Sequence, residues 1–404
     1  MRVLIAHNRY SSAHPSGENE VVASEAQQLR DAGVDVELFL RSSEEIELMS
    51  PVRKVLVGGA PIYSGSSHQR LARVLRDRRP DVVHLHNPYP LLSPWVVRAA
   101  HALGIPVVQS VHNFRHVCIS GNHFRNGAPC DRCAGRRAPW PAVQHACYRG
   151  SRLQTVPMAV AMVAHRGTWR SVERFLAISP LIAEHLAADG VERRRITVKP
   201  NAVPDPGVAA GSGHGFLFAG RLTPEKGLSL LLDAWRRHPV GSLGTLRVLG
   251  DGPLRPLVQA AAAERADVEW VGHVPGDEVA RHLAAAAVVV VPSVWPEPFG
   301  LVAVEALAVG RPVLATRCGN LPAIVGGEAQ GAGWLVEPTV RDLADALVVA
   351  HRDAGRYGPG ARARYESTFA PDAVISALLD IYRDVSGSAR PLGVDRPAVP
   401  VLDR

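Results

Sequence analysis

The chain has 404 residues, of which 47% are hydrophobic and 21% are charged. That length favours two or three domains, and that composition excludes a disordered chain and a coiled coil. Forty-five Lys and Arg against 38 Asp and Glu give a formal net charge of +7. The charge suits an anionic partner such as a nucleotide, a phospholipid surface or nucleic acid. Aromatic residues make up only 5% of the chain, which argues against a platform for base stacking.

The sequence shows no targeting or membrane-spanning signal. The start, MRVLIAHNRY, has too short an apolar core and too little basic lead for a signal peptide. The longest apolar run, Leu283 to Pro292, falls well short of the roughly 20 residues that span a bilayer. We therefore expect a cytoplasmic protein, soluble or bound peripherally at the inner face of the membrane.

Short β-rich apolar runs alternate with longer helical patterns throughout the chain, which is typical of parallel sheets with crossover helices. In the first half, strands are predicted at 2–7, 34–40, 81–86, 106–111, 174–179 and 196–199. In the second half, they are predicted at 215–220, 245–250, 268–272, 287–292, 312–316 and 333–337. Six strands per half predict an α/β fold with two doubly wound, Rossmann-like domains that face one another across a cleft.

A segment rich in Pro, Gly and Ala separates the two halves. It runs from 200 to 215, PNAVPDPGVAAGSGHG, and lacks any periodicity. We place the boundary near residue 205, so that the domains are 1–205 and 206–386. The tail 387–404 has several prolines and no periodic pattern, and we expect it to be loosely ordered.

Two loops of the second half carry candidate chemistry. After the strand at 215–220, Arg221 and Lys226 lie five residues apart just before a helix, and their charges can neutralise a diphosphate. After the strand at 287–292, Glu297 lies in a loop and Glu305 about one turn into the next helix. One carboxylate can face a sugar hydroxyl and the other a ribose diol.

Anion binding is also expected at the start of that helix. The backbone N–H groups of Phe299, Gly300 and Leu301 would point out of its first turn.

These phrases resemble a known family. EPFGLVAVEALAVGRPVLAT together with RLTPEKG is similar to the E-x7-E and phosphate-clamp motifs of family 4 retaining glycosyltransferases of the GT-B fold. Asn201 in KPNAV, Gly250-Asp251-Gly252 and Val271-Gly272-His273-Val274 also fall where that family places them, so the similarity covers nearly the whole chain.

The resemblance implies a role for each residue. Arg221 and Lys226 would clamp the donor diphosphate, Glu305 would hold the ribose hydroxyls, and Glu297 would hold hydroxyls of the transferred sugar. The segment around His273 would lie against the nucleobase. No catalytic metal is implied, because the two cationic side chains replace it.

The first half is then expected to bind the acceptor. Ser16-Gly17 precedes a helix, and Gly17 can bring the backbone close to a phosphate or sugar. The family often has two glycines here, whereas this chain has Glu18 after Gly17. His112 ends the strand at 106–111 and is the best candidate in this half for a contact near the reacting carbon.

Four of the five cysteines fall within thirty residues of one another, in a Cys-rich insertion at 112–150. Cys118, Cys130, Cys133 and Cys147 have the spacing C-x11-C-x2-C-x13-C, which favours a structural zinc site. Disulfides remain open, as does replacement of one ligand by a nearby histidine, namely His116, His123 or His145. The cluster is expected to order a flap at the acceptor side.

This part of the chain is also strongly basic. Residues 111–175 hold ten Arg and no Lys, with Asp131 and Glu173 as the acids. These arginines would meet an anionic acceptor or an anionic membrane, although arginine usage typical of a GC-rich genome would explain them equally well.

The sequence therefore predicts a retaining glycosyltransferase that moves a sugar from a nucleotide-diphosphate donor, most commonly a UDP-sugar, to a hydroxyl of a glycan, glycolipid or small metabolite. Two alternatives stay open. A GT-B epimerase or phosphorylase would reuse the cleft, and a nucleic-acid-binding protein would use the arginines.

Overall fold

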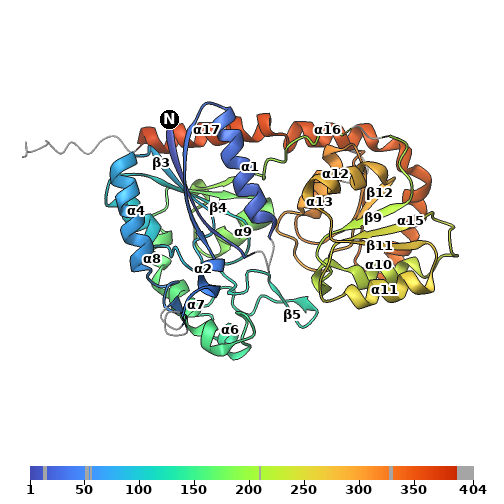
Figure 1. Ribbon diagram of the computed structural model, residues 1–404, viewed down its shortest axis with the longest axis horizontal. Helices are drawn as coiled ribbons and strands as arrows, with labels where there is room; N and C mark the ends of the chain where they lie inside the picture. The colour runs from blue at the N-terminus through green and yellow to red at the C-terminus, as the bar shows by residue number, and fades with distance from the viewer. Residues whose placement is uncertain (12–15, 51–53, 55–56, 209–210, 327–330, 389–404) are drawn as a thin grey trace, which may run out of the picture.

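The structure is a computed structural model, and it describes residues 1–388 apart from 12–15, 51–53, 55–56, 209–210 and 327–330. Most of the predicted tail, 389–404, lies outside the described residues. The chain forms two α/β units that lie side by side (Figure 1).

The first unit is built on a parallel sheet of six strands in the order β2-β1-β3-β4-β7-β8. Their bounds are β1 Arg2–Arg9, β2 Asp35–Ser42, β3 Val82–Leu85, β4 Val107–Val111, β7 Arg174–Ala177 and β8 Ile196–Val198. The sheet is covered on both faces, so its central strands are buried along nearly their whole length, as β1 and β4 are.

Helices cover the first sheet from both sides. Its helices are α1 Gly17–Asp31, α2 Glu44–Glu47, α4 Gly65–Arg78, α5 Trp95–His101, α6 Trp140–Gln144, α7 Arg152–Ala164, α8 Arg166–Trp169 and α9 Pro180–Ala188. Side chains of α4, α5 and α9 form one core against the sheet, while α1 contributes to a core on the opposite face.

The second unit repeats this plan in the order β11-β10-β9-β12-β13-β14, again all parallel. The strands are β9 Phe216–Ala219, β10 Leu246–Leu249, β11 Val268–Gly272, β12 Val288–Val291, β13 Val313–Thr316 and β14 Gly333–Val336. The helices are α10 Leu228–Trp235, α11 Arg255–Glu264, α12 Gly276–Ala285, α13 Leu301–Ala308, α14 Leu321–Val325, α15 Val340–Asp353 and α16 Gly358–Thr368. All twelve predicted strands are present, and the predicted fold class is confirmed.

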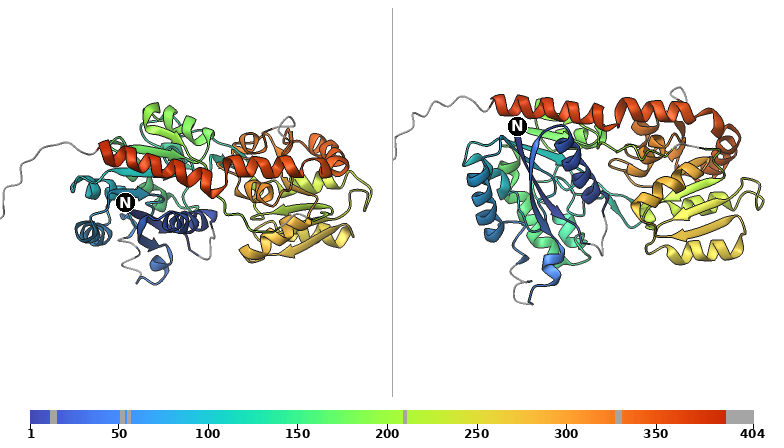
Figure 2. Two further views of the ribbon diagram at one scale, coloured as in Figure 1. Left: turned by 90° about the horizontal axis from the view of Figure 1, so that it is seen from above. Right: turned by 45° about the horizontal axis from the view of Figure 1, so that its top comes forward.

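The last helix departs from the expected domain division. α17 (Pro371–Ser388) continues from α16 across the top of both units and lies on the first one (Figure 2). Its Ile375, Leu378, Tyr382 and Val385 are buried in the same core as α1 and the first sheet. Residues 371–386, expected in the second domain, therefore pack on the first, because this amphipathic helix buries its apolar stripe there.

No described helix combines the length and the apolarity that crossing a bilayer requires.

Candidate active site

A cavity of about 520 Å³ lies between the two units, at the carboxyl ends of both sheets. The loops after β1 and β4 line it from one side, and the loops after β9 and β12 line it from the other. In open α/β sheets this edge is where ligands bind. Eight of the predicted site residues line this one cavity: Gly17, His112, Arg221, Lys226, Glu297, Phe299, Gly300 and Leu301.

Lys226 and Glu297 are paired inside the cavity. The Lys226 ammonium donates to Glu297 Oε2 at 2.7 Å, and Ser293 Oγ and Trp295 Nε1 each donate to the same oxygen at 3.0 Å. The Glu297 residue is only 5% exposed. An incoming diphosphate therefore has to share or replace the carboxylate as the partner of Lys226.

Gly227 explains how two residues so far apart in the sequence meet. It has φ = 74°, and a Cβ there would collide with the Pro292 carbonyl at the end of β12. A side chain at this position would push the Lys226 turn away from β12.

Arg221 is the more accessible of the two cations. Its side chain is 55% exposed, and its guanidinium lies 3.5 Å from Glu225 Oε1. The group can turn toward a ligand at little cost because an exposed ion pair of this length is weak.

The start of α13 presents free amides to the same cavity. Gly300 is the N-cap with φ = 96°, and within the described residues the amides of Phe299, Gly300 and Leu301 donate no hydrogen bond. The positive end of the helix dipole adds to their attraction for an anion.

Glu305 lies one turn further along α13, half-buried and outside the lining of the cavity. Within the described part of the chain its carboxylate makes neither a hydrogen bond nor an ion pair. Burial raises the pKa of Glu305 to about 7. His273 is exposed and also lies outside that lining, so its contact with the nucleobase stays a prediction.

Asn201, noted above only as part of the resemblance, also lines the cavity. The residue is 4% exposed, and its Oδ1 is buried without a hydrogen-bond partner. An unsatisfied buried oxygen at a cavity wall is costly unless a ligand donates to it.

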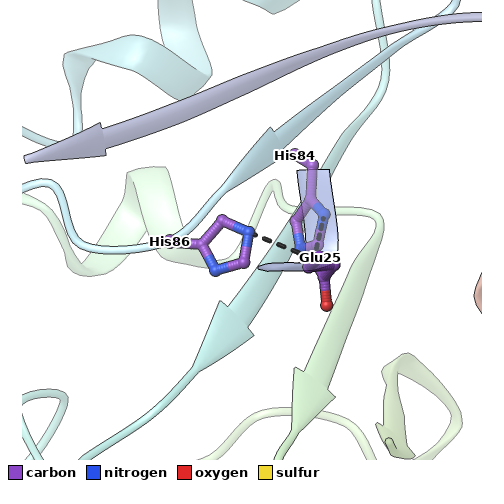
Figure 3. A group of neighbouring side chains, drawn as sticks. All are labelled: Glu25, His84 and His86. Atoms are coloured by element: carbon purple, nitrogen blue, oxygen red, sulfur yellow. Dashed lines mark ion pairs between the residues drawn. The ribbon is translucent and has the colours of Figure 1, made fainter. Parts of the chain in front are cut away.

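His112 is held from behind by a chain of buried polar groups. Its Nε2 lies 2.9 Å from His86 Nδ1, and His86 Nε2 lies 3.3 Å from Glu25 Oε1. Glu25 also binds the buried ammonium of Lys199. Figure 3 shows the contacts of Glu25 with both His84 and His86.

These buried groups keep the ring of His112 uncharged. The pKa of Glu25 is well below its usual range: burial alone would raise it, but Lys199 and His84 outweigh burial. His86 Nε2 and Glu25 Oε1 approach one another without a hydrogen bond, so this contact acts through charge. Burial, and next the nearby His86, lower the pKa of His112, so the ring is neutral and one of its two nitrogens can accept a hydrogen bond.

The ligand atoms of Glu25, His84 and His86 lie within 4.8 Å of one another, which is close enough for a metal ion. The atoms that would bind a metal already have partners, however. The Lys199 ammonium forms an ion pair with the Glu25 carboxylate. Tyr382 Oη lies 2.6 Å from His84 Nδ1, and Ser110 Oγ lies 2.9 Å from His84 Nε2. The ammonium would repel a cation, so we assign this group to holding His112.

Sequence reasoning missed a second, half-buried network in the first unit. Glu18 Oε2 accepts from Tyr10 Oη at 3.2 Å and from Asn113 Nδ2 at 3.4 Å, and Arg115 donates to Tyr10 Oη at 2.7 Å. All four residues line the cavity. The signal in the sequence was Glu18 itself, which stands where the family often has a second glycine.

A second cavity, of about 450 Å³, adjoins the first through Arg115, which lines both. Its lining holds two carboxylates, Asp189 and Glu192, against six arginines: Arg115, Arg136, Arg137, Arg166, Arg170 and Arg195. Arg136 and Arg166 donate to backbone carbonyls, which carry no negative charge, whereas Arg195 also lies 3.9 Å from Glu192 Oε1. The cavity is built to attract an anion.

The four clustered cysteines also meet. Cys118, Cys130, Cys133 and Cys147 line one small cavity of about 20 Å³, and none of them forms a disulfide.

Comparisons with known proteins agree with this geometry. Residues 16–202 match a family model for a glycosyl transferase 4-like domain, and residues 213–353 match one for glycosyl transferases group 1. The D-inositol 3-phosphate glycosyltransferase of Kineococcus radiotolerans is 30% identical over 422 residues, covering 91% of this chain and 90% of its own. The phosphatidyl-myo-inositol mannosyltransferase of Mycobacterium leprae is 29% identical over 413 residues, covering 95% and 96%.

Solved structures share the fold. Anabaena HepE in complex with UDP superposes with a TM-score of 0.66 at 17% identity, covering 95% of this chain and all of its own. Sucrose-phosphate synthase from Thermosynechococcus elongatus gives 0.69 at 19% identity, covering 96% and 99%. With two Rossmann-like units, Arg221 and Lys226 in the cleft between them and relatives matched over at least 90% of their length, the chain belongs to the GT-B glycosyltransferases of the group 1 family.

Proposed function

We propose that this enzyme is a retaining glycosyltransferase that uses a UDP-sugar. The observation that carries the proposal is the cleft itself, where Arg221, Lys226 and the free amides of α13 converge on one space between two Rossmann-like units. The Anabaena relative in fold was solved with UDP and with UDP-glucose, which favours uridine as the base.

The reaction is a displacement at the anomeric carbon of the donor sugar. The bond from that carbon to the β-phosphate oxygen breaks, and a bond to the acceptor oxygen forms on the same face. The proton of the acceptor hydroxyl passes to the departing diphosphate. Arg221, Lys226 and the α13 amides stabilise the charge that develops there, which is the largest contribution we assign to the protein.

Other residues position the two substrates. Glu305 accepts from the ribose hydroxyls, and Glu297 accepts from a hydroxyl of the transferred sugar while it holds Lys226. His112, neutral and fixed by His86, accepts near the reacting carbon. Gly17 lies against Leu301, so close that an added Cβ would stand 3.2 Å from the Leu301 side chain, and this contact closes the cleft around the donor.

The acceptor is anionic in this proposal, and it occupies the arginine-rich cavity beside the donor. Two relatives are named for phosphorylated inositols, D-inositol 3-phosphate and phosphatidyl-myo-inositol. Six arginines against two carboxylates give the cavity of this chain the charge that a phosphate needs.

The surface beside that cavity favours an acceptor carried by a membrane lipid. Leu153, Val156, Val160 and Val163 recur at helical spacing along α7 and are 84%, 43%, 45% and 44% exposed. Trp140 on the adjoining α6 is 67% exposed. An exposed apolar stripe with an aromatic residue and nearby arginines is the pattern of a face that lies on an anionic bilayer.

Product analysis tests the reaction. The enzyme would be incubated with UDP-glucose, UDP-galactose, UDP-N-acetylglucosamine or GDP-mannose, and with D-inositol 3-phosphate, phosphatidylinositol or uncharged inositol. Mass spectrometry would detect transfer and NMR the anomeric configuration. We expect release of UDP, retention of configuration and preference for the phosphorylated acceptors. Inversion, or transfer to uncharged inositol alone, would contradict the proposal.

Vesicle sedimentation tests the membrane face separately. At low salt the enzyme should sediment with phosphatidylglycerol vesicles and be released as salt is added, because each basic residue near such a surface contributes on the order of 1 kcal/mol that ions screen. Leu153→Ser/Val156→Ser should weaken sedimentation. The matched control is Val348→Ser, since Val348 is 46% exposed on α15 of the other unit. An equal effect of the control, or no sedimentation at all, would rule out this face.

A further inference from the structure

The Cys-rich insertion has very little regular structure to hold it together. Between β4 and α7 the described elements are the two-residue strands β5 (Phe124–Arg125) and β6 (Ala128–Pro129) and the single-turn α6. Its apolar core is small, with Tyr89, Ile119, Ala142, Met158 and Ala161 as its buried members. So short an insertion with so small a core usually needs a covalent or metal staple.

The backbone of the insertion is nevertheless specific. His123, Asn126, Ala146 and Arg149 all have positive φ, between 49° and 54°, although none is glycine. Such conformations are unfavourable for residues with a side chain and persist where the surroundings fix them. Two of the four lie close to Cys147 in the sequence: Ala146 directly precedes it, and Arg149 follows it by two residues.

The four thiols surround a single small cavity. Its volume of about 20 Å³ is room for about one water-sized sphere. The same cavity contains His123, whose Nε2 is buried without a hydrogen-bond partner.

We propose that Cys118, Cys130, Cys133 and Cys147 bind one structural zinc ion. Four sulfurs are the ligand set of closed structural zinc sites, and the C-x2-C turn of Cys130 and Cys133 supplies two of them from one loop. The four sulfur atoms do not all lie within 4.8 Å of one another, as the ligand atoms of Glu25, His84 and His86 do. Zinc at about 2.3 Å from each sulfur would draw them together as the thiols lose their protons.

The zinc site would act on the active site through Arg115. Cys118 N donates to Phe114 O at 2.7 Å, and Phe114 N donates to Gly121 O at 3.2 Å, so the turn that carries Cys118 also fixes the backbone around Arg115. Arg115 lines both the donor cavity and the arginine-rich cavity. Zinc therefore positions Arg115 between the two proposed substrates. This consequence rests on the proposed function, whereas zinc binding itself does not.

Metal analysis of the full-length protein, purified without added metal, tests the site. We expect about one zinc per chain, and cobalt(II) in its place should show the visible absorption of tetrahedral thiolate coordination. Cys130→Ser/Cys133→Ser should lose the metal. The control Cys318→Ser should keep it, because Cys318 lies outside the insertion at the end of β13.

Several results would overturn the inference even if the double variant failed to fold. Wild-type protein with no bound metal and five titratable thiols would do so, as would a mass showing disulfides within the cluster. If Cys118→Ser kept its zinc and His123→Gln lost it, the ligands would be His123 and three cysteines, and the proposed set of four sulfurs would be wrong. Titration with UDP distinguishes these failures from failure of the proposed function, because UDP binding to the second unit does not need the zinc.

Discussion

Lys226 and Glu297 form an ion pair in the cleft, and we propose that Lys226 binds the donor diphosphate while Glu297 binds the transferred sugar. We expect Lys226→Ala to lower turnover by about 10² or more, because it removes charge-assisted contact with the leaving diphosphate. Glu297→Gln should keep nucleotide affinity and lose sugar transfer, because its partners are Lys226, Ser293 and Trp295 rather than the ribose.

Steady-state kinetics together with UDP titration check this division. Arg236→Ala, at the end of α10 and outside the cleft, is the control for charge loss alone. Near-wild-type turnover in Lys226→Ala would contradict the assignment.

Glu305 gives donor binding a pH dependence whose direction can be stated. Its pKa of about 7 in the free enzyme should fall when the ribose hydroxyls donate to the charged carboxylate, so the complex binds fewer protons than the free enzyme. Affinity should then rise with pH up to about 7 and level off above it. Titration with UDP-glucose avoids the ionisation of a terminal phosphate. In Glu305→Gln, the affinity for UDP-glucose should no longer depend on pH in this range. An unchanged pH dependence would show that another group titrates.

The same shift predicts a cost in stability. A carboxyl whose folded pKa is raised destabilises the fold progressively as pH rises from its unfolded value of about 4.3 to its folded one. Glu305→Gln should therefore gain more stability relative to wild type at pH 8 than at pH 5, as denaturant unfolding at both pH values would show.

His86 is a positioning residue for His112 in this account. His86→Leu should lower kcat by about 10² through misplacement of His112. His86→Gln should recover much of the rate, because its amide can donate to Glu25 and accept from His112. If His86 only stabilises the fold, His86→Leu and His86→Gln should have equal rates whenever their thermal stabilities are equal. That result would show that His86 does not position His112.

At the scale of secondary structure, α17 couples the end of the chain to the first sheet. Leu378 is fully buried, and Tyr382 Oη lies 2.6 Å from His84 Nδ1. Leu378→Ala should destabilise the protein by about 2–5 kcal/mol, with faster hydrogen exchange in β1 and β3, while UDP binding persists. Arg383→Ala, 67% exposed on the same helix, should change little. Loss of protection confined to the second sheet would contradict this packing.

The strands were predictable from sequence and the long-range placement of α17 was not. A buried parallel strand such as β12 is an unbroken apolar run, VVVV, so its period and length identify it directly. The apolar face of α17 can also be recognised in the sequence, but its pattern does not indicate which of the two sheets the helix packs against. The allocation of 371–386 by sequence order was wrong for that reason.

The candidate site divides in the same way. Arg221, Lys226, Glu297 and the start of α13 come from loops with a local signature, and the cavity collects them. The contact of Lys199 with Glu25 joins residues 174 apart in sequence, and no local pattern predicts it. Arg115 was visible as one of ten arginines in its stretch, and only the fold distinguishes it from the other nine.

At the scale of the whole molecule, the enzyme consists of two units with separate tasks that meet at one cleft. In the proposed function, the second unit supplies the cations and amides for the donor, and the first supplies His112, Glu18 and the basic cavity for the acceptor. Donor binding should therefore survive damage to the Cys-rich insertion, whereas transfer should not.

Calorimetric titration of UDP into wild-type enzyme and Arg221→Ala shows whether the cleft binds a nucleotide diphosphate through Arg221, and it needs no knowledge of the acceptor. We expect one site per chain in the wild type and at least about tenfold weaker binding in the variant, corresponding to about 1.4 kcal/mol from one charge-assisted contact. Absence of binding by UDP and GDP alike, or equal affinity in the two proteins, would contradict it.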